Sequence, residues 1–179
     1  IVSRLVGHKG LDLIREVMEK SLWERDIQYV VLGSGEWQYE SFFRELHDKY
    51  PDKVGVTIGF IPDLARKIYA GADLFLMPSK SEPCGLSQMV ALRYGTVPIV
   101  RETGGLKDSI TDSGDGEGNG FTFQTYDAYD MLGAIYRGVE AYNNKDYWPT
   151  LVERALNCDM SWGKSANEYI KMYKSLLKD

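Results

Sequence analysis

The chain has 179 residues, of which 44% are hydrophobic and 26% are charged, and this is sufficient for one globular domain of ordinary size. Its net charge is −5 and its lysines and arginines form no cluster, which argues against an extended nucleic-acid or membrane-surface patch. No apolar run reaches transmembrane length, and no signal peptide is expected. The two cysteines, Cys84 and Cys158, form no CxxC pair, so neither a zinc site nor a disulfide framework is expected and a reducing compartment is the default.

Short apolar runs alternate with amphipathic stretches over the first 123 residues. In chain order we expect a strand remnant at 1–5, a helix at 11–20, a strand at 27–32, a helix at 36–50, a strand at 54–58, a helix at 62–69, a strand at 74–77, a helix at 85–94, a strand at 97–100, a tight loop at 104–105, a glycine-rich surface loop at 111–120 and a short strand at 120–123. The first residues resemble the middle of a strand, so we expect the chain to start inside a larger protein.

The last fifty residues contain three expected helices, at 128–143, 146–157 and 161–177, with no strand between them. Their aromatic residues, among them Trp148, Trp162 and Tyr169, are expected to pack in the core. The strand–helix alternation before them predicts one α/β domain over residues 1–179, with a doubly wound, mainly parallel sheet. Such sheets bind ligands beyond the carboxyl ends of their strands.

The loop after the first expected strand combines two cations with a glycine-containing turn into a helix. Arg4 offers a forked guanidinium for phosphate oxygens, and Lys9 adds a point charge five residues later. The start of the following helix adds free N–H groups. This pattern predicts an anion site, although two surface cations without a role would give the same sequence.

A second candidate loop leaves the expected strand at 74–77. Glu82 is suited to accept hydrogen bonds from sugar hydroxyls, and residues 84–87 would present backbone N–H groups to a diphosphate at a helix start. The alternatives are a first-turn helix charge for Glu82 and a catalytic nucleophile for Cys84. The nucleophile is disfavoured because no histidine is tied to Cys84 by a motif, and a small residue in a tight turn explains it better.

Two glycine pairs remain ambiguous. Gly104 and Gly105 permit close approach of the backbone to a ligand, but any tight turn uses the same residues. Gly33 and Gly35 begin a dinucleotide-binding fingerprint whose third glycine would fall at position 38, where the chain has Gln38. We therefore discard a nicotinamide-dinucleotide site.

Together these loops resemble the signatures of glycogen and starch synthases. Residues 3–13 resemble the family's "SRL…KGLDL", residues 82–88 its "EPCGLTQ", residues 93–108 its "RYGTxPIVRxTGGLxD", and residues 161–169 its "SW..SA..Y". The resemblance runs from one end of the chain to the other, and its motifs are long and in the same order.

This resemblance implies the GT-B architecture, in which two Rossmann-like domains face each other across a cleft. The chain would be the second, donor-binding domain of a cytoplasmic (in plants, plastid) retaining enzyme. That enzyme transfers glucose from ADP-glucose to the non-reducing end of an α-1,4-glucan. The acceptor would be held by an N-terminal domain upstream of Ile1, and the isolated chain is expected to be inactive. Neither a metal nor another cofactor is expected, and the same holds for nucleic-acid and membrane partners.

The resemblance also implies roles for particular residues. Arg4 and Lys9 would hold the ADP diphosphate, and Glu82 would meet the hydroxyls of the donor glucose. Phe60 occupies a position where the family usually has a tyrosine that stacks on adenine, and its ring provides the same π face. The remaining residues implied at the donor site are Cys84, Gly85, Leu86, Ser87, Tyr94, Gly104 and Gly105.

Two departures from the related patterns affect this interpretation. Ser81 stands where the family commonly has phenylalanine, and Met89 stands where many related glycosyltransferases have a second glutamate. The absence of that glutamate favours the ADP-glucose synthases. No carboxylate is placed as a nucleophile, so the resemblance favours a front-face route in which the diphosphate helps to deprotonate the acceptor. A donor domain for UDP- or GDP-sugars and a catalytically silent nucleotide- or glucan-binding module remain the alternatives.

Overall fold

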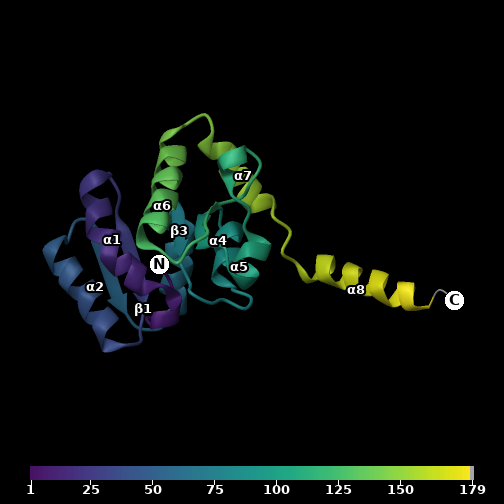
Figure 1. Cartoon of the computed structure of the whole chain (residues 1–179), viewed down its shortest axis with the longest axis horizontal. Helices are drawn as coiled ribbons and strands as arrows, with labels where there is room; N and C mark the ends of the chain where they lie inside the picture. The colour runs from purple at the N-terminus through teal and green to yellow at the C-terminus, as the bar shows by residue number, and fades with distance from the viewer. Residues whose placement is uncertain (178–179) are drawn as a thin grey trace.

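The computed structural model describes residues 1–177, and its elements follow the expected alternation (Figure 1). The helices are α1 (Leu11–Glu24), α2 (Trp37–Lys49), α3 (Pro62–Gly71), α4 (Ser87–Arg93), α5 (Gly104–Ser109), α6 (Ala128–Asn143), α7 (Trp148–Asn157) and α8 (Trp162–Leu176), with 3-10 turns η1 (Gly7–Lys9) and η2 (Ser113–Asp115). The strands are β1 (Tyr29–Gly33), β2 (Val54–Ile58), β3 (Leu74–Met77), β4 (Val97–Arg101) and β5 (Phe121–Phe123). Within the described residues, no helix is both long and apolar enough to cross a membrane.

The strands form two parallel hydrogen-bonded groups. β1 pairs with β2, and β3, β4 and β5 pair in that order. The segment 1–5 runs parallel to β1 through isolated bridges from Val2 to Leu32 and from Leu5 to Gly35, on the edge of β1 that β2 leaves free. The predicted α/β fold with a parallel, Rossmann-like arrangement is therefore confirmed, although the expected first strand is reduced to these two bridges.

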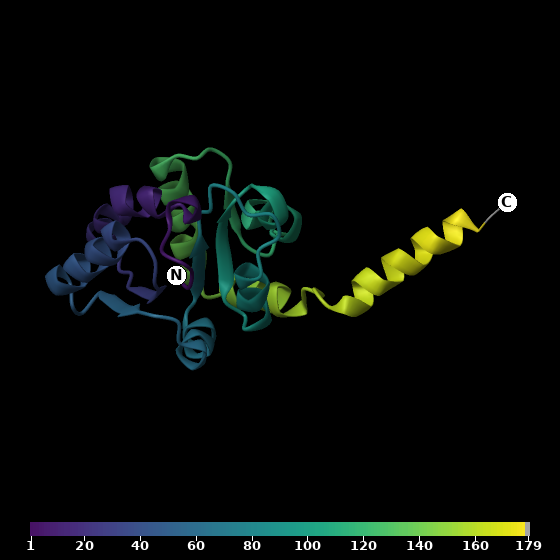
Figure 2. The same ribbon diagram turned by 90° about the horizontal axis from the view of Figure 1, so that it is seen from below.

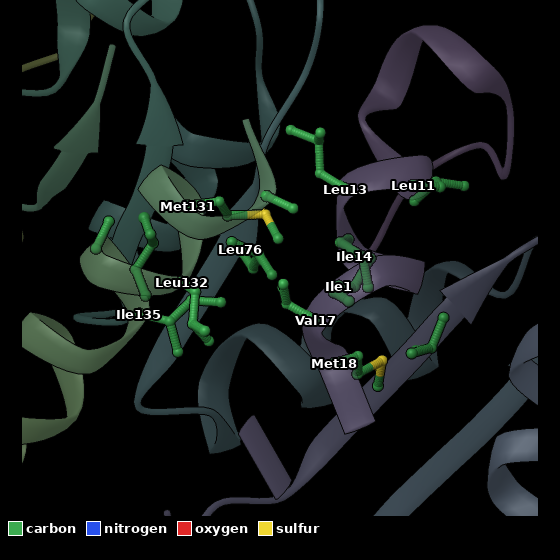
Figure 3. Close-up of a cluster of buried hydrophobic side chains, with 14 of the residues drawn as sticks. Ile1, Leu11, Leu13, Ile14, Val17, Met18, Leu76, Met131, Leu132 and Ile135 are labelled. Carbon is green, nitrogen blue, oxygen red and sulfur yellow. The ribbon is translucent and has the colours of Figure 1, made fainter. Parts of the chain in front are cut away.

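Helices cover both faces of the strands because the strand side chains alternate between two apolar clusters. On one face, Leu76 of β3 and Ile99 of β4 belong to a cluster that α1 and α6 complete with Val17 and Met131 (Figure 3). On the other face, Phe75 and Met77 of β3 and Val100 of β4 pack with buried residues of α4 and α5. Burial on both faces explains why these strands read as continuous apolar runs.

A cleft remains between the two hydrogen-bonded groups. Ile1, Tyr29 and Val30 line it on one side and Leu74, Phe75 and Leu76 on the other, with a volume of about 550 Å³. The amine of Ile1 donates a hydrogen bond to the Val30 carbonyl at 2.8 Å, and burial lowers the pKa of this amine from 8.0 to about 5. Instead of a continuous ladder of hydrogen bonds between strands, the segment 1–10 and the helices join the two groups of strands.

The prediction for the glycine pair was wrong, and so was the prediction for two of the three tail aromatics, whereas Trp148 is partly buried and packs against the apolar cluster that includes Leu76. Gly104 and Gly105 begin helix α5 instead of forming a tight loop, because the carbonyls of Glu82 and Pro83 accept the Gly105 N–H. In α8, Trp162 is 89% exposed and Tyr169 is 58% exposed. Figures 1 and 2 show α8 projecting away from the rest of the chain, so these aromatic rings have no core to enter.

Candidate functional site

Two loops that are distant in sequence meet at the carboxyl edge of the strands. The turn η1 follows the segment 1–5, and the loop 78–86 follows β3. The backbone N–H of Lys80 donates to the His8 carbonyl at 2.9 Å, which ties the two loops together. Gly10 permits this approach: it has φ 76°, and a Cβ there would lie 2.1 Å from the carbonyl oxygen of Pro78.

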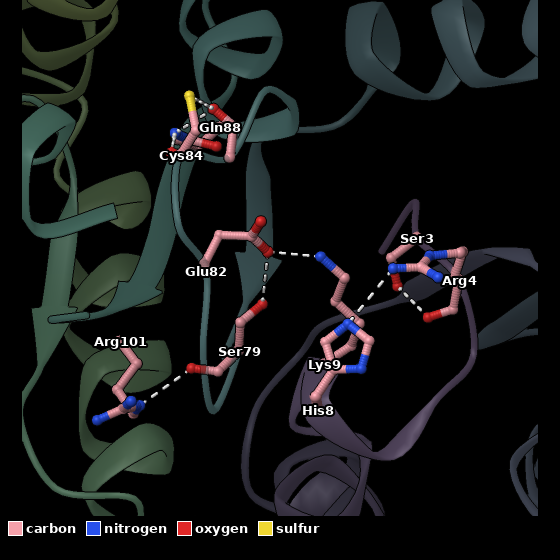
Figure 4. Close-up of polar contacts among 10 residues, drawn as sticks. Ser3, Arg4, His8, Lys9, Ser79, Glu82, Cys84, Gln88 and Arg101 are labelled. Carbon is pink, nitrogen blue, oxygen red and sulfur yellow. Dashed lines mark hydrogen bonds and ion pairs between the residues drawn. The ribbon is translucent and has the colours of Figure 1, made fainter. Parts of the chain in front are cut away.

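Lys9 and Glu82, both predicted site residues, form an ion pair across this contact. The Lys9 Nζ lies 2.5 Å from the Glu82 Oε2, and their side chains are only 14% and 12% exposed (Figure 4). The fully buried Ser79 donates from its Oγ to the same carboxylate oxygen at 3.3 Å. The structure thus brings the expected phosphate-binding cation and the expected sugar-binding carboxylate together, and each neutralises the other.

Arg4 lies on the same side of the molecule but is not neutralised in this way. Its side chain is exposed, and the contact recorded for its guanidinium is a long one of 3.5 Å to the His8 Nε2. Among the side chains that the structure describes, no carboxylate lies within ion-pair distance of it. Arg4 is therefore available to an incoming anion, whereas Lys9 already has a partner.

The loop that follows Glu82 is held by a buried glutamine. Gly85 has φ 74°, so the helix α4 begins at Ser87 and not at Gly85 as expected. The Gln88 Nε2 donates to the carbonyls of Cys84 and Gly85 at 3.2 and 2.9 Å. Cys84 and the N-cap residue Leu86 are exposed, whereas Gly85 between them is buried.

The start of α5 packs against the back of this loop. A Cβ on Gly104 would lie 2.1 Å from the Glu82 carbonyl oxygen, and one on Gly105 would lie 2.0 Å from the Cys84 carbonyl oxygen. Because glycine has no side chain, the two backbone segments can lie in direct contact at these positions. Direct contact of these glycines with a ligand remains a prediction.

Two predicted residues lie apart from this cluster. Phe60 follows β2 and is 90% exposed, so its ring is not part of the core and is available for stacking. Tyr94 is the C-cap of α4, at the opposite end of the helix from Leu86, and its ring stacks on Tyr69 with a centroid distance of 6.2 Å. The structure does not bring Tyr94 together with Lys9 and Glu82.

Sequence reasoning gave no role to Arg101, although the residue lies inside one of the quoted motifs. Arg101 ends β4, and its guanidinium donates to the carbonyls of Ser79 and Lys80 at 3.0 and 2.5 Å. These carbonyls belong to the loop that carries Glu82. Among the residues that the structure describes, no cluster of three or more His, Cys, Asp or Glu side chains is arranged to hold a metal ion.

Comparison with known proteins agrees with this geometry. A family model described as "Glycosyl transferases group 1" matches residues 1–147. Glycogen synthase from Bacillus cereus (strain ATCC 10987 / NRS 248) is 53% identical over 99% of this chain and 38% of its own length. The catalytic domain of starch synthase IV from Arabidopsis thaliana, bound to ADP and acarbose, is 39% identical with a TM-score of 0.87, over 97% of this chain and 37% of that one.

More distant solved structures share the fold. TarM is 19% identical with a TM-score of 0.74, over 97% of this chain and 34% of that one. The chain spans well under half of the length of the curated relatives it matches. Its end-to-end match to glycogen synthases confirms the resemblance that its motifs indicated. From the arrangement of its loops and from the match over residues 1–147, the chain belongs to the group 1 glycosyl transferases.

Proposed function

We propose that this chain is the donor-binding part of a retaining glucosyltransferase that transfers glucose from ADP-glucose to the non-reducing end of an α-1,4-glucan. The observation that carries the proposal is the ion pair between Lys9 and Glu82 at one edge of the strands, with Arg4 in contact with His8 next to Lys9. Two cations suit a diphosphate, and a carboxylate beside them suits the hydroxyls of the attached sugar.

The charges of the site match those that glycosyl transfer creates. As the bond between the glucose C1 and the diphosphate oxygen breaks, positive charge grows on the sugar ring and negative charge on the leaving diphosphate. In this proposal Arg4 and Lys9 stabilise the leaving group, without a metal ion. The acceptor hydroxyl bonds to C1 on the face that the diphosphate leaves, and its proton passes to a diphosphate oxygen. Glu82 orients the sugar through hydrogen bonds to its hydroxyls and forms no covalent bond to it.

Similarity and the exposure of Phe60 support the proposed nucleotide, and similarity supports the proposed compartment. Phe60 is exposed at the carboxyl end of β2, where it would stack on adenine. The starch synthase IV structure, 39% identical to this chain, is bound to ADP. The bacterial relatives of this chain that are named glycogen synthase favour a cytoplasmic enzyme. For a plant source, the proposed location is the plastid.

The acceptor glucan is assigned to the part of the full-length protein that this chain does not include. The chain covers 38% of the Bacillus cereus glycogen synthase, so most of such an enzyme lies outside it. Transfer requires an acceptor hydroxyl held against the anomeric carbon in a cleft from which water is excluded. We therefore expect the chain alone to bind ADP and ADP-glucose weakly and not to elongate glycogen.

Radiolabelled transfer from ADP-glucose to glycogen tests the proposal, with the full-length protein and this chain assayed in parallel. Transfer by the full-length protein, with none by the chain, supports it. Incorporation by the chain alone would refute the division of labour between the two parts. Competition by unlabelled ADP, UDP and GDP distinguishes an ADP-glucose enzyme from one that uses another donor. Absence of transfer from ADP-glucose, UDP-glucose and a GDP-sugar alike would indicate a silent binding module.

A further inference from the structure

Arg101 contacts the loop that carries Glu82 from the side opposite to the Glu82 carboxylate. We propose that Arg101 is a positioning residue, which fixes this loop so that Glu82 is presented to the donor sugar. The inference rests on the proposed function, because it assigns to Arg101 a role in that same site. The role proposed for Arg101 does not include contact with the substrate.

The geometry of the guanidinium supports this role. Its Nε donates to the Ser79 carbonyl at 3.0 Å, and its Nη2 donates to the Lys80 carbonyl at 2.5 Å. Its Nη1 makes a longer contact of 3.5 Å with the Gln124 carbonyl. The planar fork of arginine can thus hold two successive carbonyl groups at once, which the single ammonium group of a lysine cannot do with the same geometry.

The segment that Arg101 holds connects directly to both charged residues of the site. The Ser79 side chain is fully buried and donates to Glu82, and the Lys80 N–H donates to the His8 carbonyl next to Lys9. Figure 4 shows Ser79 between Arg101 and Glu82. A shift of the 79–80 peptide would therefore move Glu82 relative to Lys9.

A tyrosine strengthens this arrangement from outside the loop. The Arg101 guanidinium and the Lys80 ammonium lie 5.7 and 5.4 Å from the centre of the Tyr126 ring. The Tyr126 hydroxyl donates to the Asp12 carboxylate in α1 at 2.5 Å. Arg101 therefore connects β4, the Glu82 loop and, through Tyr126, the helix that follows Lys9.

The test is a double-mutant cycle in the full-length protein between Arg101→Lys and Glu82→Gln, with transfer from ADP-glucose as one readout. Arg101→Lys keeps the charge but loses the fork, and we expect kcat to fall by roughly tenfold while the KM for ADP-glucose changes by less than about threefold. In the Glu82→Gln background the same change should lower kcat by less than about threefold, because the carboxylate that it positions is gone. Arg137→Lys is the matched control: Arg137 also donates to a carbonyl, that of Thr122, but does not contact the loop. It should leave kcat within about twofold.

The inference is overturned if Arg101→Lys lowers kcat by the same factor in both backgrounds, or if Arg137→Lys lowers kcat as much as Arg101→Lys does. Either result would indicate a general effect on stability. The second readout, pyrophosphate affinity by titration calorimetry, does not require transfer. A loosened loop weakens the Lys9–Glu82 pair, so Glu82→Gln should change pyrophosphate affinity less in the Arg101→Lys background than in the wild type. If the wild type transfers no glucose, the proposed function fails, and this affinity cycle still decides the role of Arg101. A wild type that neither transfers glucose nor binds pyrophosphate refutes both.

Discussion

The ion pair between Lys9 and Glu82 leads to a prediction of unusual sign: removing the charge of Glu82 should tighten the binding of pyrophosphate and ADP. An anion that binds Lys9 must compete with a carboxylate that already lies 2.5 Å from the ammonium group. Glu82→Gln keeps the size of the side chain and removes the competitor. Lys9 is then left partly buried without a counterion, and this favours a phosphate oxygen beside it.

The magnitude follows from the burial of the pair. A hydrogen bond to a charged group contributes roughly 1.5–3 kcal/mol, and with side-chain exposures of 14% and 12% this pair is little screened by solvent. The neutral amide can still accept one hydrogen bond from Lys9, so we take the lower end of that range. A gain of about 1.4 kcal/mol corresponds to a roughly tenfold tighter pyrophosphate complex.

ADP-glucose should respond differently from ADP to the same substitution. Glutamine keeps one acceptor oxygen but loses the charge that strengthens hydrogen bonds from the sugar hydroxyls. This loss offsets the gain at the diphosphate, so the preference for ADP-glucose over ADP should fall by roughly tenfold. A single variant thus separates the part of the site that binds phosphate from the part that binds sugar.

Titration calorimetry with pyrophosphate, ADP and ADP-glucose measures these changes. Glu36→Gln is the matched control, because Glu36 accepts a hydrogen bond from the Gly7 N–H beside η1 and does not contact Lys9. It removes the same charge from the same region. Equally tighter pyrophosphate binding in this variant would therefore indicate that the overall electrostatic potential of the protein causes the effect. Unchanged or weaker pyrophosphate binding in Glu82→Gln would refute the reasoning, as would persistence of the tightening in a Lys9→Met background.

Three further predictions concern other residues. Arg4→Ala should weaken ADP binding by roughly tenfold without changing the fold, because an exposed cation without a carboxylate partner is lost; unchanged affinity in calorimetry would contradict this. Phe60→Ala should weaken ADP more than pyrophosphate, and an equal loss for both ligands would show that its ring does not stack on the base. A chain whose first residue is Ile1 should lose stability as the pH falls from 8 towards 5, because its amine takes up a proton when it unfolds but, with a pKa of about 5, remains neutral when buried. The expected loss is about 2–3 kcal/mol between pH 8 and pH 6 in urea unfolding, and it should be absent from a chain extended before Ile1.

The strands were predictable where local sequence decides them. Residues 54–58 and 74–77 are short apolar runs between clear breaks, and the structure has strands at these positions. The role of Gly104 and Gly105 was not predictable in this way, because glycine marks both tight turns and close packing. What makes these residues a helix start is a pair of carbonyl groups about twenty residues earlier in the chain.

The site was predictable in composition but not in its pairings. The motifs identified Lys9 and Glu82 as separate ligands, yet their separation of 73 positions in the sequence gives no sign that they contact each other. Arg101 was visible as a motif residue, but its function depends on where two carbonyl groups lie in space. The exposed aromatics of α8, such as Trp162, show the same limit: an amphipathic pattern predicts a helix without identifying the surface that it contacts.

The division of the strands into two hydrogen-bonded groups has a consequence for thermal stability. Lys9 follows the segment beside β1, and Glu82 follows β3, so the ion pair crosses from one group to the other. A diphosphate sugar that binds both residues would act as a crosslink between the two halves of the domain. Its binding free energy would then add directly to the free energy that resists their separation, so the donor substrate would also serve as a structural component of the domain.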